Sequence, residues 1–212
     1  MVSRDEAERR PRADALRNRE RLLEAAKAAF AELGAGVALE DIARRADVGI
    51  GTLYRHFPTR DAIVEAVYSR EVRQLAASAE GLLSELPPGE ALRAWMRLFV
   101  DYLATKKVIA PALSAMVGGA SALYETSSGL IKGAISLLAE QAVAAGEIRS
   151  DIEVADLMQA LAGLAYGVAH PGWRTSALRL IDILMAGLRP DSAEDAAVSN
   201  PPAPPGNRRR TG

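Results

Sequence analysis

Four side chains close together in the sequence can donate hydrogen bonds: Thr52, Tyr54, Arg55 and His56. They fall within about two helical turns, and a helix that short adds little stability by itself. Hydroxyl, guanidinium and imidazole groups at this spacing suit hydrogen bonds to phosphates and base edges, and the major groove of DNA admits a helix. These residue types therefore predict contact with DNA.

Two short apolar segments around a turn would position these side chains. Apolar residues at helical spacing before the turn can share a small core with those after it. Asp47 stands at the turn, where glycine is common, and Asp tolerates the left-handed backbone conformation better than most residues. The pattern predicts a helix-turn-helix over residues 39–46 and 50–57. Its core residues are Leu39, Ile42, Ala43, Ala46, Val48, Leu53 and Phe57.

At these residues the chain resembles the TetR family of bacterial transcriptional regulators. The family's run is present as Gly-Thr-Leu-Tyr-Arg-His-Phe over residues 51–57, followed by Pro-Thr-Arg over residues 58–60. Val37 and Ala38 stand where the family usually has Thr or Ser, and Gly49 stands where Ser is frequent, so hydroxyls that contact phosphate are missing. The resemblance implies these DNA-contacting positions: Ala38, Gly49, Ile50, Gly51, Thr52, Tyr54, Arg55, His56 and Arg60.

Phosphate contacts position a helix on DNA, and base contacts read its sequence. We expect Ile50, Thr52 and Arg55 to approach base edges, and the hydroxyl of Thr52 also to reach phosphate together with Tyr54 and His56. Arg60 follows Thr59, which can cap a new helix whose N-terminus favours a phosphate. For Arg60 the alternative is a solvated surface charge.

Composition favours a helical protein. The chain has 212 residues, enough for a small module joined to a larger one. Hydrophobic residues make up 49% and aromatic residues only 5%, which is typical of packed helices, so we expect an all-α fold. The absence of cysteine excludes disulfides and thiolate metal sites, and no cofactor is expected. No apolar run approaches the ~20 residues that span a membrane, and the charged N-terminus shows no secretory signal, so we expect a cytoplasmic protein.

The charge distribution has the sign expected for DNA binding, although it is weak. The net charge is −1, while residues 1–60 carry 12 Lys and Arg against 10 Asp and Glu. Affinity would therefore rest on a few well-placed contacts and not on a broad basic patch.

The chain divides into four expected parts. Residues 1–16 are polar and mixed in charge, which predicts a disordered arm, and residues 190–212 predict a disordered tail. Residues 17–60 form the DNA-binding module, and a long helix from Thr59 leads into a larger helical part over residues 61–189. We expect about nine helices, over 17–33, 39–46, 50–57, from 59, after Pro87-Pro88-Gly89, over 108–117, over 121–145, after a cap at Asp151, and around 178–188.

The larger part carries most of the aromatic residues. Each of them is more often plain core than a ligand contact. As a group they suit a largely apolar pocket with a few polar groups, and the resemblance implies such a pocket for a small-molecule effector. The candidate lining residues are Trp95, Met96, Phe99, Tyr102, Met116, Tyr124, Tyr166, His170 and Trp173.

The last two expected helices are more apolar than the surface of a small monomer requires. Pairing them with their own copies would form a four-helix bundle and a homodimer, which the resemblance also implies. The alternative is that both helices are internal core. The candidate interface residues are Ala160, Gly163, Gly167, Leu178, Ile181, Leu184, Met185 and Leu188.

These patterns favour a sequence-specific DNA-binding regulator, and the resemblance implies a homodimeric repressor released from a palindromic double-stranded operator by a small, largely hydrophobic ligand. A helix-turn-helix protein without an inducer is the nearest alternative. An enzyme is disfavoured, because His56 and His170 are the only histidines and neither Gly118-Gly119 nor the glycines of the turn have a phosphate-loop context. A purely structural helical dimer would leave the donors of residues 52–56 unexplained.

Overall fold

The computed structural model describes residues 4–116, 119–167 and 170–190, except for the side chains of residues 4–12 and 166. Most of these residues are helical, the others lie in turns and loops, and none of them is in a strand, so the expected all-α fold is confirmed. The described part of the chain holds eight helices: α1 (Arg4–Leu33), α2 (Leu39–Arg45), α3 (Ile50–His56), α4 (Arg60–Glu85), α5 (Pro88–Ser114), α6 (Ser121–Ala144), α7 (Val154–Tyr166) and α8 (Trp173–Gly187).

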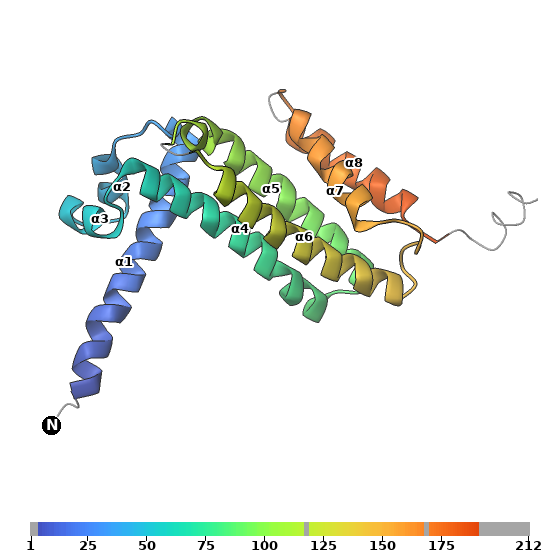
Figure 1. The fold of residues 1–212 in the computed structure, drawn as a ribbon, viewed down its shortest axis with the longest axis horizontal. Coiled ribbons are helices and arrows are strands. Elements are labelled where there is room, and N and C mark those ends of the chain that lie inside the picture. The colour runs from blue at the N-terminus through green and yellow to red at the C-terminus, as the bar shows by residue number, and fades with distance from the viewer. Residues whose placement is uncertain (1–3, 117–118, 168–169, 191–212) are drawn as a thin grey trace, which may run out of the picture.

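The first three helices form a small domain at one end of the molecule (Figure 1). Leu53 and Phe57 are buried with Ile42 against the inner face of α1, as the apolar spacing predicts. Asp47 has a φ of 53°, so the predicted left-handed residue of the turn is confirmed. Arg21 of α1 donates a hydrogen bond of 3.0 Å to the Asp47 carboxylate, which links the turn to α1.

Helix α1 begins earlier than expected. The sequence predicted a disordered arm over residues 1–16, whereas the structure continues α1 back to Arg4, with residues 1–3 outside the described part. The segment is rich in Ala, Arg and Glu, which favour helix, and it stays helical although Pro11 lacks an N–H donor and its ring crowds the preceding turn. Figure 1 shows this part of α1 projecting away from the other helices.

Helices α4, α5 and α6 lie side by side, and α7 and α8 form a further layer over them (Figure 1). Thr59 caps α4 as predicted, since its hydroxyl accepts a hydrogen bond of 3.1 Å from the Ala62 N–H. The expectation of separate helices around residues 92–103 and 108–117 is wrong, because α5 runs unbroken to Ser114. No glycine or proline interrupts residues 90–110, and Pro111 lies so near the end that it removes only a last-turn bond.

The cap of α7 also differs from the prediction. Asp151 was expected to cap this helix, but the Glu153 N–H donates to the Asp156 carboxylate at 3.2 Å and α7 begins at Val154. Asp151 instead accepts two hydrogen bonds of 2.6 Å from Arg149, and this contact lowers the pKa of the Asp151 carboxyl. Asp151 therefore pairs with the nearby Arg149 and does not cap α7.

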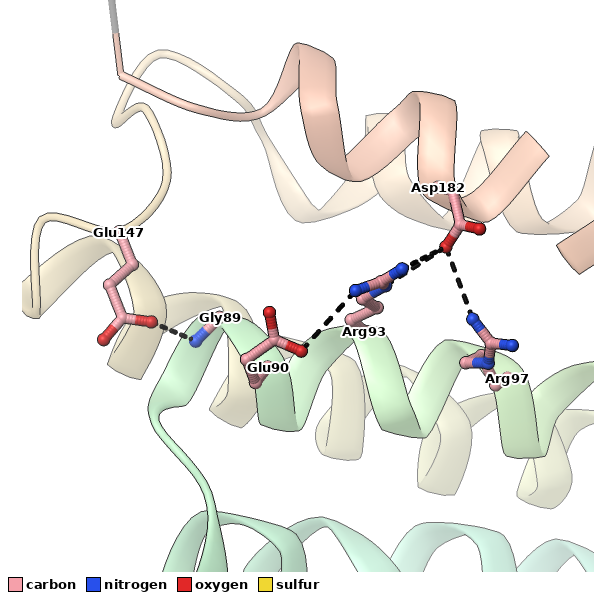
Figure 2. A network of polar contacts seen from close by, with 6 residues as sticks. All are labelled: Gly89, Glu90, Arg93, Arg97, Glu147 and Asp182. Carbon is pink, nitrogen blue, oxygen red and sulfur yellow. Dashed lines mark hydrogen bonds and ion pairs between the residues drawn. The ribbon is translucent and has the colours of Figure 1, made fainter. Parts of the chain in front are cut away.

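Ion pairs attach α8 to α5 at two places. Near the start of α8, Arg174 donates to Asp101 at 2.7 Å. Further along, Asp182 accepts from Arg93 at 2.8 Å and from Arg97 at 3.4 Å, as Figure 2 shows. The two attachments hold α8 along α5 while leaving its opposite face uncovered. Within the described ranges no helix is long and apolar enough to cross a membrane.

Candidate functional site

Helix α3 presents the side chains expected to contact DNA. On the inner side of α3, Leu53 packs into the core and has no exposed surface. On the outer side Tyr54 and Ile50 are 45% and 38% exposed, which is unusual for residues of their size. Gly49, Gly51 and Arg55 are exposed too, and Thr52 and His56 are half-buried. One short helix therefore offers phenol, guanidinium, hydroxyl and imidazole groups around an apolar Ile50.

The two positions that lack the usual hydroxyl lie at helix starts. Ala38 precedes α2 and Gly49 precedes α3, both in extended conformation, and neither helix has a side-chain cap. Both residues are exposed, and a methyl group added at Gly49 would meet nothing within 4 Å. The space for a hydroxyl is present at Gly49, but the group is missing.

Arg60 has protein partners that the sequence did not predict. Its guanidinium donates to the backbone carbonyls of Ala35 and Val37, both at 2.7 Å, and it is half-buried. It thereby ties the start of α4 to the loop between α1 and α2. These bonds give Arg60 a structural role in the joint between these segments, which we expect in place of the phosphate contact.

Replacing Arg60 separates these two roles. We expect Arg60→Ala to lower the free energy of unfolding by about 1–3 kcal/mol, because two carbonyls lose a charged donor. Arg60→Lys should recover part of that loss. The slope of log DNA affinity against log salt should stay unchanged, whereas a phosphate contact would lower it by about one unit. Urea unfolding and a salt titration of DNA binding measure the two quantities.

Helix α4 is bonded to α1 by ion pairs that sequence periodicity does not indicate. Lys27 of α1 contacts the buried Glu71 of α4 at 2.7 Å. Arg70 of α4 reaches Glu24 at 2.9 Å and Glu20 at 3.2 Å. Any movement of α4 must therefore be transmitted to α1 or break these contacts.

A cavity of about 600 Å³ lies between α4, α5, α6 and α7. Its walls are mostly apolar and aromatic, which is typical of sites for small molecules. Three of the nine candidate pocket residues line it, namely Phe99, Tyr102 and Tyr124. The remaining lining residues were not predicted, and they are Tyr68, Leu103, Lys106, Ser127, Ser128, Ile131, Met158, Ala162 and Ala165.

The other predicted pocket residues lie elsewhere. Trp95 and Met96 have no exposed surface and belong to the core, where the Trp95 indole donates to the Leu75 carbonyl at 2.7 Å. Met116 packs half-buried beside the core outside the cavity lining, and the side chain of Tyr166 is outside the described part. His170 and Trp173 line a smaller depression of about 220 Å³ near the junction of α7 and α8.

A cluster of tyrosines forms one part of the polar lining of the large cavity. The Tyr68 and Tyr102 hydroxyls are 3.1 Å apart, and the Tyr68 and Tyr124 rings meet edge-on with centroids 5.8 Å apart. Burial raises the pKa of Tyr102 above its ordinary value, and the hydrogen bond with Tyr68 adds to the effect. Burial, followed by Tyr68, also raises the pKa of Tyr124. Tyr102 and Tyr124 therefore remain neutral at pH 7 and can donate hydrogen bonds.

The predicted interface residues divide between two faces of α7 and α8. Ile181 and Leu188 are buried inside the protomer. Gly167 faces its own chain, since a methyl group there would lie 2.8 Å from the Trp173 ring. The half-buried members Ala160, Leu178, Leu184 and Met185 also do not form the outermost surface, whereas Gly163 is exposed with open space around it.

The outer face of α8 carries two large apolar side chains that the sequence prediction missed. Leu180 is 50% exposed and Ile183 is 67% exposed. With the exposed Ser176 and Gly187 they form one stripe along α8, and Leu180 lines the small depression together with Gly163 of α7. We call Gly163, Leu180 and Ile183 the outer patch.

Comparisons with known proteins agree with this arrangement. The profile of bacterial regulatory proteins of the tetR family matches residues 22–67, and that of the C-terminal domain of SbtR-like transcriptional regulators matches residues 87–190. The crystal structure of the TetR transcriptional regulator SCO0520 from Streptomyces coelicolor is 50% identical with a TM-score of 0.75, covering 82% of this chain and 99% of that one.

A TetR transcription regulatory protein from Mycobacterium vanbaalenii is similar over 84% of this chain and 99% of its own, with 36% identity and a TM-score of 0.69. A curated relative, the HTH-type transcriptional regulator SAR0097 from Staphylococcus aureus (strain MRSA252), is 38% identical over 47 residues. That match spans only 25% of the relative's length and 22% of this chain.

Proposed function

Since this chain belongs to the TetR family of transcriptional regulators, with a DNA-binding helix-turn-helix, we propose that it is a cytoplasmic repressor released from its operator by a small molecule. In this proposal a homodimer binds a palindromic double-stranded operator. The family and the fold are those of transcriptional regulators and not of enzymes.

One observation carries the ligand-response part of the proposal. Tyr68 lines the cavity from α4, and Glu71, one turn further along α4, is paired with Lys27 of the DNA-binding domain. A ligand that contacts Tyr68 therefore acts on a helix whose next turn is bonded to α1. To shift the equilibrium, the ligand must bind the conformation that does not fit DNA more tightly than the one that does. A coupling of about 1–3 kcal/mol would change DNA affinity by roughly 5- to 150-fold.

The outer patch supports the dimer. Packing α7 and α8 against their copies would cover Leu180 and Ile183, and the small Gly163 would let the helices approach closely. Two α3 helices would then meet half-sites about 34–36 Å apart, one turn of DNA.

On the DNA, we assign base contacts to Ile50, Thr52 and Arg55, and phosphate contacts to Tyr54 and His56. The exposed or half-buried positions of these side chains on α3 support the assignment. The backbones at Ala38, Gly49 and Gly51 lie close to the DNA in this proposal.

Binding of the protein to the DNA upstream of its own gene tests the proposal. We expect a retarded complex in an electrophoretic mobility assay, and a loss of about 1–3 kcal/mol of binding free energy in Arg55→Ala. Arg73→Ala is the matched control, because Arg73 is an exposed arginine of α4 whose guanidinium bonds the Ser69 carbonyl. Equal losses in both variants would contradict the role of Arg55. A complex that no apolar ligand releases would favour a regulator without an inducer.

A further inference from the structure

Lys106 is the only charged side chain among the twelve residues that line the large cavity. It is half-buried, and no carboxylate lies within ion-pair distance of it in the described part of the chain. Its ammonium group stands 5.2 Å from the centre of the Tyr124 ring. This contrasts with Lys27, Arg70, Arg93 and Arg174, which all meet acidic side chains. The cavity therefore holds a positive charge that its own walls do not balance.

The remaining polar groups of the cavity suit an acceptor placed beside that charge. Tyr124 keeps a neutral phenol, and the hydroxyls of Ser127 and Ser128 come from the same helix α6, one turn further along. The Ser127 hydroxyl already donates to the Leu123 carbonyl at 2.6 Å, so it can only accept a further hydrogen bond. Lys106 and Tyr124 therefore bring an ammonium donor and a phenol donor to the same part of the cavity.

We propose that the effector of this protein is an apolar monocarboxylic acid whose carboxylate pairs with Lys106 and whose body lies between the tyrosines and Met158. The proposal rests on the ligand-response function proposed above and specifies its ligand. A carboxylate gains a charge-assisted hydrogen bond from the ammonium group, and a neutral ligand would leave that charge unpaired.

A monocarboxylate fits better than a phosphate. Phosphate sites commonly use arginine forks or several cations, and this cavity has a single lysine and no arginine in its lining. The aromatic walls supply flat apolar surface, with the Phe99 and Tyr102 ring centres 5.5 Å apart. The volume of about 600 Å³ is within the range for drug-sized ligands.

Three pyrene probes with the same apolar body test the proposal: 1-pyrenebutyrate, 1-pyrenebutanol and 1-pyrenebutylamine. We expect the full-length protein at pH 7 to bind the carboxylate about tenfold more tightly than the alcohol, with the amine weakest, as the loss of one charge-assisted bond to the half-buried Lys106 predicts. Fluorescence anisotropy measures each dissociation constant. Displacement of bound 1-pyrenebutyrate by dodecanoate, with dodecanol as the uncharged control, then compares a fatty acid with an aromatic acid that carries the same carboxylate.

Lys106→Met should remove the preference for the carboxylate without weakening the binding of the alcohol, and Lys106→Arg should keep the preference. Lys107→Met is the matched control, because this neighbouring lysine is exposed and does not line the cavity. Thermal unfolding checks that all variants are folded.

Equal affinity of the wild type for carboxylate and alcohol would overturn the anionic ligand while leaving the proposed ligand response intact. Binding of no probe at all would overturn both the acid and the cavity as the effector site. DNA binding in the mobility assay is independent of either result.

Discussion

Replacing Leu180 and Ile183 together by aspartate is expected to yield a monomer whose operator affinity is lower by at least about 100-fold. Burial of a leucine or isoleucine side chain contributes about 1.5–3 kcal/mol, and a symmetric interface contains each residue twice. The variant also places four carboxylates in the same contact. A monomer presents one α3 helix, so the contacts of the second half-site are lost.

Analytical ultracentrifugation at micromolar concentration measures the oligomeric state, and fluorescence anisotropy with a labelled operator measures the affinity. Leu130→Asp is the matched control, because Leu130 is 40% exposed on α6 and outside the outer patch. A double variant that still sediments as a dimer would refute the interface. If it is monomeric yet binds the operator with full affinity, dimerisation is not needed for recognition.

The second large effect concerns stability. We expect Trp95→Ala to lower the free energy of unfolding by about 3–5 kcal/mol, a large part of the roughly 5–15 kcal/mol that holds a typical domain together. Trp95 has no exposed surface, stacks on Phe99 with ring centres 6.0 Å apart, and bonds the Leu75 carbonyl of α4. Its removal leaves a cavity between α4 and α5 that these long helices cannot fill by a small shift.

Calorimetry should show a midpoint roughly 6–20 °C lower for Trp95→Ala in a chain of this size. Trp95→Phe keeps most of the apolar volume and loses the indole donor. We therefore expect the free energy of unfolding to fall by about 1 kcal/mol because of the lost hydrogen bond. A Trp95→Ala variant with an unchanged midpoint and altered ligand affinity would instead place Trp95 in the ligand site.

The fold of the small DNA-binding module was largely predictable from the sequence, because the residues that determine it are close together along the chain. The left-handed residue Asp47, the cap at Thr59 and the burial of Leu53 and Phe57 each depend on neighbours within a few residues or one adjacent helix. Such local preferences act before any distant contact forms. The roles of the exposed side chains of α3 in base and phosphate contact stay predictions.

The larger helical part of the chain, residues 61–189, shows what depends on tertiary structure. Trp95 and Phe99 are one turn apart on α5, equally apolar in type and both buried in the core, yet only Phe99 also lines the cavity. Likewise Ile181 is buried and Ile183 exposed on the same helix. A helix with apolar residues on several faces has no single inner face in its sequence, so the neighbouring helices decide which residues they cover. Arg60 follows the same rule, since the carbonyls that hold it lie more than twenty residues away in the chain. The sequence by itself determined the all-α class, the helix-turn-helix and its local turn geometry, and the packing of distant helices determined which side chains became core, cavity wall or outer patch.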